Sequence, residues 1–430
     1  MTEGHKQLKA LVYKGAEDKK LDITDIVLDR ISDELSVIEK QGFTEYFILY
    51  SRIIEICNEL ELLSSYGRGS AANSIVNYCL DITKINPIYE NLIFERFIHP
   101  NQKQLPDIDI DIPKGQQKVV IEKLKQKYPE YSTFYIAFLP KRETDYENVV
   151  YNNTVYKKHP CGVIITSKTI THSTFQYKEH NFYLALDGPN DLFFYDKIDI
   201  LELEYLNRLQ LIVDEIGKNY HPYKLPLNDK HVFNFFASGD LENIFQFNTP
   251  STKQILSEFK PQSIYDLSVI NAMFRTGLAD YIPTVIRNKY CNEERFCLSD
   301  IRVSKILKET YGCLIYQETF LHLSKEIAGI SFAEADVWRR KIMRDKSNTE
   351  VIEYSSVFAS GCRKYSSLNE DDIASLTNLI TGMLRLTFQK THSLSYSIIG
   401  YWGAYYKTHF RPHFDSAFSK DIKFQSFELY

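Results

Sequence analysis

The feature that most constrains the fold is the segment Pro106-Asp107-Ile108-Asp109-Ile110-Asp111-Ile112-Pro113, in which three carboxylates alternate with three isoleucines. Successive side chains of a strand point to opposite faces of a sheet, so the segment predicts a strand with one apolar and one acidic face. Carboxylates held this close repel one another unless a cation lies between them, and oxygen-only ligands suit Mg²⁺. A strand that simply presents its acids to solvent is the alternative, and the three Asp residues alone do not decide between the two.

A glycine-rich turn precedes this strand, in the segment Ser64-Ser65-Tyr66-Gly67-Arg68-Gly69-Ser70-Ala71-Ala72-Asn73-Ser74. Gly67 and Gly69 allow a tight turn and the close approach of a ligand to the backbone. Ser70 is a good N-cap, and the helix predicted to follow it would offer its first N–H groups to an anion. Arg68 adds a guanidinium suited to phosphate oxygens. Most such turns only cap a helix, but this one before an acidic strand predicts a triphosphate site beside a metal site, as nucleotidyl transfer requires.

Together with Phe94-Glu95-Arg96-Phe97, these two segments resemble the palm of the bacterial replicative DNA polymerase III alpha subunit, which is family C of the DNA polymerases. Further motifs follow in the order of that family between about residues 25 and 415: His159 to Ile164, Lys197 to Leu201, Phe245 to Phe247, Phe274 to Gly277, Tyr316 to Glu318, Trp338 to Arg340 and Phe388 to Ser393. The resemblance implies an α+β fold, with a polymerase-beta-like nucleotidyltransferase palm (a mixed sheet with helices) followed by a mostly helical fingers region.

Composition is that of an ordinary globular protein, with 44% hydrophobic and 25% charged residues. The formal net charge of −5 means that nucleic-acid binding would use local basic patches rather than a global field. We expect no membrane partner, because no apolar run reaches transmembrane length and the N-terminus lacks a signal peptide's apolar stretch. The seven cysteines show no metal-ligand spacing, which indicates reduced thiols in a cytoplasmic protein.

Helical periodicity over residues 23–63, broken at Gly42, predicts two helices that support the palm. Further along the chain we expect a basic helix over 116–128, strands over 162–166, 182–186 and 193–200, a helix over 204–217, a basic helix end at 338–346 and a last apolar helix from Lys390. By resemblance, we divide the chain into a palm at 1–113 and 159–220, a much reduced thumb-like insertion at 114–158, fingers at 221–415 and a C-terminal tail at 416–430.

The main departure from the family pattern is the insertion at 114–158. In the family this point leads to a sizeable thumb that holds the primer–template duplex, whereas here a short stretch rich in Tyr and Asn separates the predicted basic helix from His159. Each lost phosphate contact lowers salt-dependent affinity for DNA, so we predict low processivity. The sequence also has no counterpart of the histidinol-phosphatase-like domain that precedes the palm in the family's cellular enzymes.

The resemblance also assigns roles to single residues. Asp107, Asp109 and Asp199 would be the catalytic acids and would hold two Mg²⁺ ions, while Asp111, on the same strand face, stays open as a replacement for Asp107 or Asp109. Arg96 would reach the primer terminus or the active-site phosphates, unless it pairs with Glu95 or an Asp of the strand. Residues expected to bind the nucleotide are Arg68, Gly69, Ser70, Lys197, Arg275, Arg339, Arg340, Lys390 and His392. A solvated basic surface is the alternative for Arg339, Arg340 and Lys390, and a structural hydrogen bond is the alternative for His392.

By resemblance, the chain is predicted to be a DNA-templated DNA polymerase that uses dNTPs and primer–template DNA. The residues themselves support only metal-dependent nucleotidyl transfer. Alternatives are a catalytically weak or inactive paralogue that binds nucleotide or a replication partner, and a template-independent terminal transferase. The segment Gln425–Tyr430 is similar in character to a sliding-clamp peptide, although one residue longer. It suggests a sliding clamp as partner, with a frayed terminus as the alternative.

Overall fold

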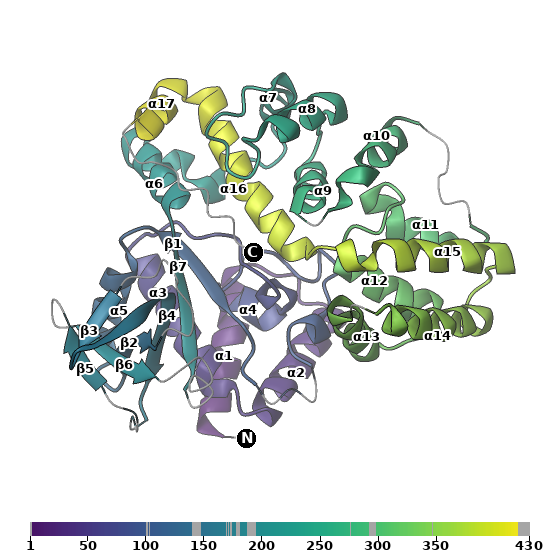
Figure 1. The fold of residues 1–430 in the computed structure, drawn as a ribbon. Coiled ribbons are helices and arrows are strands. Elements are labelled where there is room, and N and C mark those ends of the chain that lie inside the picture. The colour runs from purple at the N-terminus through teal and green to yellow at the C-terminus, as the bar shows by residue number, and fades with distance from the viewer. Residues whose placement is uncertain are drawn as a thin grey trace. The chain divides into compact units, whose positions relative to one another are not determined.

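The computed structural model describes residues 2–99, 102, 104–139, 148–168, 170, 172, 174–177, 181–186, 195–275, 277–291, 298–345 and 347–419. The chain divides into two compact units, residues 1–204 and 205–430, and each is described by itself (Figure 1). This division lies earlier than the palm–fingers boundary at residue 220 that we expected from the sequence. Among the described residues, no helix combines the length and the apolar character needed to span a membrane. The expected clamp segment Gln425–Tyr430 lies outside the described residues.

The first unit begins with helices and ends with strands. Its helices are α1 (Glu3–Asp18), α2 (Asp25–Lys40), α3 (Thr44–Glu59), α4 (Ile75–Cys79) and α5 (Gln117–Lys127). The break between α2 and α3 falls at Gly42, whose φ of +75° is easy only for glycine, so the two predicted helices and their boundary are confirmed. Helix α5 confirms the predicted basic helix, although its Lys123 and Lys127 pair with Glu59 of α3 rather than forming an open basic surface.

The sheet of the first unit is mixed and seven-stranded, in the order β1-β7-β4-β2-β6-β5, with β3 paired to β4. Its strands are β1 (Asp109–Pro113), β2 (Ser132–Phe138), β3 (Asn148–Tyr151), β4 (Thr154–Thr166), β5 (Thr174–Tyr177), β6 (Asn181–Leu186) and β7 (Lys197–Leu203). Strand β1 runs parallel to β7, and β7 runs antiparallel to β4. Figure 1 shows β1 and β7 side by side at one edge of this sheet. These strands confirm the α+β class, and β1, β4, β6 and β7 confirm the palm strands predicted from the sequence.

One face of the sheet packs on the helices. Ile110 and Ile112 of β1 and Ile198 and Ile200 of β7 are buried there in a single cluster with residues of α1 to α5. Fully burying each such side chain stabilises the fold by ~2 kcal/mol, so β1 and β7 are firmly anchored. The opposite face holds a second, small apolar cluster formed by Ile136, Ile164, Leu184 and Leu186. Because side chains alternate, Asp109, Asp111 and Asp199 lie on this opposite face.

The described part of the 114–158 segment is built into the palm sheet. Strand β2 lies between β4 and β6, and β3 forms a hairpin with β4 around Asn152 and Asn153, which both have positive φ. That two-residue turn matches the twist of paired strands, which is why Asn is suited to it. In the described residues, no separate thumb is formed here, and the region extends the sheet instead.

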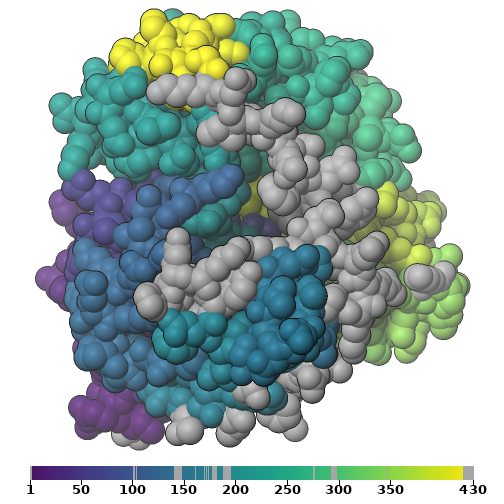
Figure 2. Space-filling model, turned by 60° about the vertical axis from the view of Figure 1, so that its left-hand side comes forward, coloured from purple at the N-terminus to yellow at the C-terminus, as the bar shows by residue number. Residues whose placement is uncertain are grey.

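The second unit is helical, as predicted. Its helices are α6 (Glu204–Ile216), α7 (Lys230–Ser238), α8 (Pro250–Phe259), α9 (Ile264–Arg275), α10 (Ile282–Tyr290), α11 (Ile301–Leu307), α12 (Gln317–His322), α13 (Phe332–Arg344), α14 (Thr349–Tyr365), α15 (Glu370–Met383), α16 (Lys390–His409) and α17 (Arg411–Ser419). Helix α16 is buried over most of its length, with Trp402 at 0% exposure, and α7, α9 and α17 pack on it. Helix α17, yellow in Figure 2, lies at the surface.

Candidate active site

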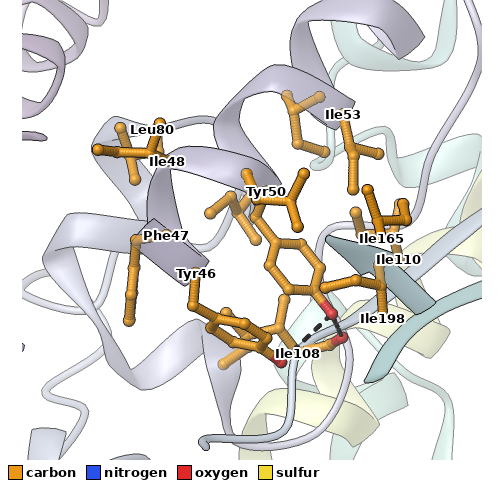
Figure 3. Packing of buried hydrophobic residues seen from close by; sticks show 14 of the residues in the cluster. Tyr46, Phe47, Ile48, Tyr50, Ile53, Leu80, Ile108, Ile110, Ile165 and Ile198 are labelled. Carbon is orange, nitrogen blue, oxygen red and sulfur yellow. Dashed lines mark hydrogen bonds between the residues drawn. The ribbon is translucent and has the colours of Figure 1, made fainter. Parts of the chain in front are cut away.

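Strand β1 presents its carboxylates as the sequence predicted. Ile108, Ile110 and Ile112 are buried on one side, while burial on the other side increases from Asp107 through Asp109 to Asp111. The entry to the strand is fixed by two tyrosines of α3. The Tyr46 hydroxyl donates to the carbonyl of Pro106 at 2.9 Å. The Tyr50 hydroxyl donates to the carbonyl of Ile108 at 2.6 Å (Figure 3). These bonds hold the backbone that carries Asp107.

Three carboxylates meet across the first two strands of the sheet. In the β1–β7 pairing Asp109 lies opposite Asp199, and one oxygen from each of Asp107, Asp109 and Asp199 lies within 4.8 Å of the others. Burial, and next to it the charge of Asp107, raises the pKa of Asp109 to about 7. Burial, followed by the charge of Asp199, also raises the pKa of Asp107. A hard divalent cation bound between these crowded carboxylates would reduce their mutual repulsion and favour their ionised form.

Two basic side chains of the same unit lie among these acids. Arg68 places its Nε 3.5 Å from Asp109 Oδ2 and an Nη 3.4 Å from Asp111 Oδ1. Lys197 donates a short hydrogen bond to Asp199, which raises the pKa of Lys197 despite the opposing effect of burial. Four carboxylates thus face two cations, and the cluster keeps an excess of negative charge.

The structure separates Asp111 from the other three acids. Its side chain is 1% exposed and pairs with Arg68, and it does not belong to the group of converging ligand oxygens. Burial raises the pKa of Asp111, although Arg68 opposes this. The geometry therefore favours Asp107 and Asp109 over Asp111 as partners of Asp199, and Asp111 connects the acidic strand to the glycine turn.

The glycine turn differs from the expectation in one respect. Gly67 and Gly69 have φ of +120° and +60°, and a Cβ on Gly67 would lie 2.8 Å from Thr83, so glycine is needed there. Ser70, however, makes no side-chain cap and precedes only a short 3₁₀ turn. The α-helix begins later, at Ile75, and its cap is Ser74. The prediction that Ser70 caps the helix is wrong, because the 71–73 segment turns once before the helix starts.

The N-terminus of α4 is also already occupied. Glu34 of α2 is 0% exposed, and its carboxylate accepts hydrogen bonds from the N–H groups of Ile75 and Val76 at 3.1 and 3.2 Å. An anion bound near the turn would therefore meet the backbone of Gly69 and Ser70 rather than the helix end. Glu34 was not among the residues predicted from the sequence, although it stands at helical spacing among the buried residues Val27, Ile31, Leu35 and Ile38.

A second group of ligand types adjoins Asp199. His159, Cys161 and Asp199 bring a ring nitrogen, a sulfur and a carboxylate oxygen within 4.8 Å of one another. His159 Nδ1, however, accepts a hydrogen bond from the amide of Gly162 at 2.7 Å, and the Cys161 thiol faces Asp199 Oδ1 at 3.6 Å. Burial, and then Asp199, raises the pKa of Cys161 to about 12, so it stays a thiol. These contacts orient Asp199, which the His-Pro-Cys-Gly motif alone did not reveal.

Arg96 lies in a 3₁₀ turn, Phe94–Arg96, and is half-buried. The backbone amide of Ile93, just before this turn, donates to Asn73 Oδ1 at 3.2 Å. Asn73 belongs to the 3₁₀ turn that follows Ser70, so the Arg96 turn and the glycine turn are connected.

In the second unit, the predicted basic residues are held by acids of the same unit. Buried Arg339 donates from Nε to Asp336 at 2.8 Å, and Arg340 pairs with the same carboxylate at 2.6 Å. Lys390 pairs with Glu309 at 2.9 Å. Arg339 and Lys390 are buried and paired with carboxylates, so they are not part of a solvated basic surface, whereas the Arg340 side chain is 41% exposed and this alternative stays open for it.

Segments far apart in the sequence converge around these cations. Gln317 donates to the sulfur of Met343 at 3.7 Å and to the carbonyl of Thr387 at 3.3 Å, while Arg339 also reaches the sulfur of Met343 at 3.3 Å. The backbone N–H of Lys390 donates to Glu318 at 2.9 Å. Arg339, Arg340 and Lys390 thus belong to one connected region at the start of α16.

The remaining two predicted residues of this unit have less defined surroundings. The His392 ring lies between the rings of Phe388 and Tyr396, with centroid distances of 5.4 and 4.3 Å. Arg275 ends α9, and its side chain lies outside the described residues. The roles of these individual residues in binding stay predictions.

Two models of one family match the chain. The bacterial DNA polymerase III alpha NTPase domain matches residues 6–144, and the bacterial DNA polymerase III alpha subunit finger domain matches residues 202–366. The two matches fall on the first and the second unit, respectively, apart from the short overlap at residues 202–204.

Relatives named DNA polymerase III subunit alpha align along most of the chain. The protein from Ureaplasma parvum is 30% identical over 474 aligned positions, which cover 95% of this chain and 48% of that protein. The protein from Halalkalibacterium halodurans is 27% identical, covering 96% of this chain and 43% of that protein. One from Staphylococcus aureus is 27% identical, covering 92% and 43%. The chain spans less than half the length of these relatives, and it belongs to the family of bacterial DNA polymerase III alpha subunits.

Proposed function

We propose that the chain is a DNA-templated DNA polymerase of family C, which transfers a nucleotide from a dNTP to the 3′-hydroxyl of a primer. The names of its relatives support this activity in general. The observation that carries the proposal is the register of β1 against β7, which sets Asp109 beside Asp199 and Asp107 within ligand distance of both.

Asp107, Asp109 and Asp199 would hold two Mg²⁺ ions. The donor set fits this ion because all three side chains offer hard oxygen ligands. The pKa of Asp107 and of Asp109 is raised by burial and then by the neighbouring carboxylates, and a bound cation would offset this cost of ionisation. When bound, Mg²⁺ would activate the primer hydroxyl and stabilise the charge that develops on the leaving pyrophosphate.

The chain's own cations and amides would hold the triphosphate. Lys197, now paired with Asp199, is placed to turn to a phosphate once the carboxylate has another cation. Arg68, which now pairs with Asp109 and Asp111, could turn to a phosphate in the same way. The backbone N–H groups of Gly69 and Ser70 would donate hydrogen bonds to the negative charge that develops on the phosphates during transfer. No side-chain nucleophile is required, because the primer hydroxyl itself attacks the α-phosphate.

The second unit and Arg96 would complete substrate binding. Arg275, Arg339, Arg340, Lys390 and His392 are the proposed contacts to the incoming nucleotide, and Arg96 is the proposed contact to the primer. Low processivity is supported by the absence of a separate thumb in the described part of 114–158. A sliding clamp bound through Gln425–Tyr430 would offset that loss, and we expect the protein to act in the cytoplasm.

The experiment that tests the proposal is extension of a labelled primer, annealed to a template or alone, with Mg²⁺ and the four dNTPs. The wild-type protein is compared with Asp109→Ala and with Asp29→Asn, an exposed acid of α2, as the matched control. Extension that depends on the template, is lost in Asp109→Ala and persists in Asp29→Asn is the expected result.

Other outcomes would overturn parts of the proposal. Extension of the lone primer would indicate a terminal transferase. No extension by any variant at low salt and high protein concentration would favour a paralogue that only binds nucleotide or a replication partner. Full extension by Asp109→Ala would contradict the metal assignment.

A further inference from the structure

Glu34 is a fully buried acid whose hydrogen-bonding capacity is completely used. Its Oε1 accepts from the N–H of Ile75 at 3.1 Å and from Arg30 Nε at 2.6 Å. Its Oε2 accepts from the Ser74 hydroxyl at 2.6 Å and from the N–H of Val76 at 3.2 Å. Each oxygen therefore faces two donors, which is an arrangement that only a carboxylate can satisfy.

Arg30 carries this network from α2 to two backbone segments. One of its Nη groups donates to the carbonyl of Asn73 at 3.0 Å and to the carbonyl of Leu92 at 3.2 Å. Asn73 follows the glycine turn, and Leu92 precedes the Phe94–Arg96 turn. One arginine thus holds the backbone of both segments while its Nε neutralises Glu34.

The side chain of Asn73 also links the same two segments. Its side-chain amide donates to the carbonyl of Ser70 at 3.0 Å, and its side-chain oxygen accepts from the N–H of Ile93 at 3.2 Å. Asn77 adds a bond to the carbonyl of Ala71 at 2.8 Å. The glycine turn and the Arg96 turn therefore form one hydrogen-bonded assembly, and its only buried acid in the described contacts is Glu34.

We propose that Glu34 and Arg30 are positioning residues for nucleotide binding, which fix the segments 68–77 and 92–96 in a single arrangement. The Glu34 carboxylate already accepts hydrogen bonds from the N–H groups at the start of α4, so these groups are not available to a phosphate. The triphosphate would therefore bind the N–H groups of Gly69 and Ser70. For its kinetic consequence this inference rests on the proposed polymerase function. Its structural part stands on the hydrogen bonds alone.

Glu34→Gln is the decisive variant, because it preserves size and shape. The amide would place N–H donors against either the Ile75 and Arg30 donors or the Ser74 and Val76 donors. Among these four groups only the Ser74 hydroxyl can turn to accept, so one or two of the four bonds become repulsive. Ser74→Ala is the milder second variant, since it removes one donor to Glu34 and leaves the carboxylate. Asp33→Asn is the matched control, because Asp33 is exposed and adjacent to Glu34 on the same helix.

The first measurement is amide hydrogen exchange of the full chain without nucleotide. In Glu34→Gln, exchange in 68–77 and 92–96 should become faster on the order of tenfold, while exchange in β4 and β6 stays as in wild type. Ser74→Ala should show a smaller change in the same segments, and Asp33→Asn should show none. This measurement does not depend on catalysis, so it decides the structural part even if wild-type protein extends no primer.

The second measurement is single-nucleotide incorporation by the variants that melt cooperatively. We expect KM for the dNTP to rise about fivefold in Glu34→Gln, with kcat changed less than twofold, because a displaced turn weakens nucleotide binding before chemistry. Unchanged exchange in both segments of a folded Glu34→Gln would overturn the inference, as would an equal loss of activity without any change in KM. If Glu34→Gln fails to fold, the same criteria apply to Ser74→Ala.

Discussion

The two units differ in how their acidic and basic side chains are paired. In the first unit Asp107, Asp109 and Asp199 converge, Asp111 lies beside them on the same strand, and Arg68 and Lys197 are the cations described among these acids. In the second unit the cations have carboxylate partners of their own. Arg339 and Arg340 share Asp336, and Lys390 pairs with Glu309.

This contrast indicates what each unit lacks before substrate arrives. The acids of the first unit repel one another and are relieved by added cations, so binding a metal lowers the free energy of a site that is already assembled. Each of these cations of the second unit already has a carboxylate partner, although Arg339 and Arg340 share one. Arg339 and Lys390, whose side chains are mostly buried, would have to leave these carboxylates to contact a phosphate, whereas 41% of the Arg340 side chain is exposed. The first unit is thus suited to bind a metal, whereas the second would have to rearrange ion pairs of Arg339 and Lys390 to bind the nucleotide as proposed.

The largest expected effect is the loss of catalysis without loss of stability in Asp109→Ala. Nucleotide incorporation should fall at least about 10³-fold, because the metal loses a central ligand. The melting temperature should stay within about 2 °C of wild type, because removal of one acid also removes repulsion from Asp107. Steady-state incorporation and thermal unfolding of the same preparation check both parts. A strongly lowered melting temperature would mean that the acids stabilise the first unit and would erase the contrast.

The matched change in the second unit is Asp336→Asn, and its expected effect is the reverse. Asp336 is 1% exposed and binds both Arg339 and Arg340, so its removal leaves the buried Arg339 without its carboxylate. Breaking a buried pair from one side costs about 3 kcal/mol. Hydrogen exchange resolved by segment should show faster opening of α13 with β1 and β7 unchanged. Asp371→Asn, an exposed acid of α15, serves as control.

The sequence predicted the elements whose information is local. The alternation of Asp and Ile fixes which face of β1 is acidic, and Gly42 marks the break between α2 and α3. Asp199 was grouped with Asp107 and Asp109 by the family resemblance, and the register of β1 against β7 brings Asp199 opposite Asp109. Local patterns carry this information because strand faces and helix ends depend on neighbours in the chain.

The sequence failed where pairing is between distant segments. Nothing near Ser70 indicated that Ser74 would cap the helix with Glu34 at its side, because Glu34 comes from another helix. The carboxylate partners of Lys390 and Arg339 could likewise not be predicted, because an ion pair produces no periodic pattern in the sequence. Helical periodicity predicts which residues are buried, but not their partners. Among these residues only Glu34, an acid among apolar positions of α2, could have been recognised from the sequence as a buried charge.

A smaller effect is expected when the support of strand β1 is weakened. Tyr50→Phe removes the hydroxyl that donates to Ile108 and leaves that buried carbonyl without this donor, which should cost about 1–2 kcal/mol. Incorporation should decline only severalfold, because Tyr46 still holds Pro106. Chemical denaturation and incorporation assays test this, with Tyr13→Phe, at a more exposed position of α1, as control. An unchanged unfolding free energy would show that the tyrosine does not anchor the strand.

The effect of Mg²⁺ on stability should depend on pH. The pKa of Asp109 in the folded chain is about 7, above its ordinary value of 3.8. Without metal the folded state therefore binds more protons, and this contribution to the free energy of unfolding falls as pH rises from about 4 to 7. Mg²⁺ must displace that proton at pH 6 but not at pH 8, so its stabilisation should grow with pH.

Thermal unfolding with and without Mg²⁺ measures this directly. We expect saturating Mg²⁺ to raise the melting temperature by about 3 °C more at pH 8 than at pH 6 in wild type. Asp109→Asn, which cannot titrate, should show little dependence on pH, and Asp29→Asn should behave as wild type. Equal Mg²⁺ stabilisation at both pH values would argue against Asp109 as a ligand.

The smallest effect tests whether the second unit must exchange ion pairs. Glu309 is a partly exposed partner of Lys390, so its pairing contributes no more than about 1 kcal/mol, and Glu309→Gln should leave the melting temperature nearly unchanged. If Lys390 has to leave Glu309 to reach a phosphate, KM for the dNTP should fall about twofold in this variant, since roughly 0.4 kcal/mol of competing attraction is gone. Lys390→Ala should raise KM instead, and Glu370→Gln, which removes the partner of Arg363 elsewhere in the unit, should change nothing. A raised KM in Glu309→Gln would mean that the carboxylate orients Lys390 for binding rather than competing with the nucleotide, and the contrast between a prepared first unit and a rearranging second unit would then fail.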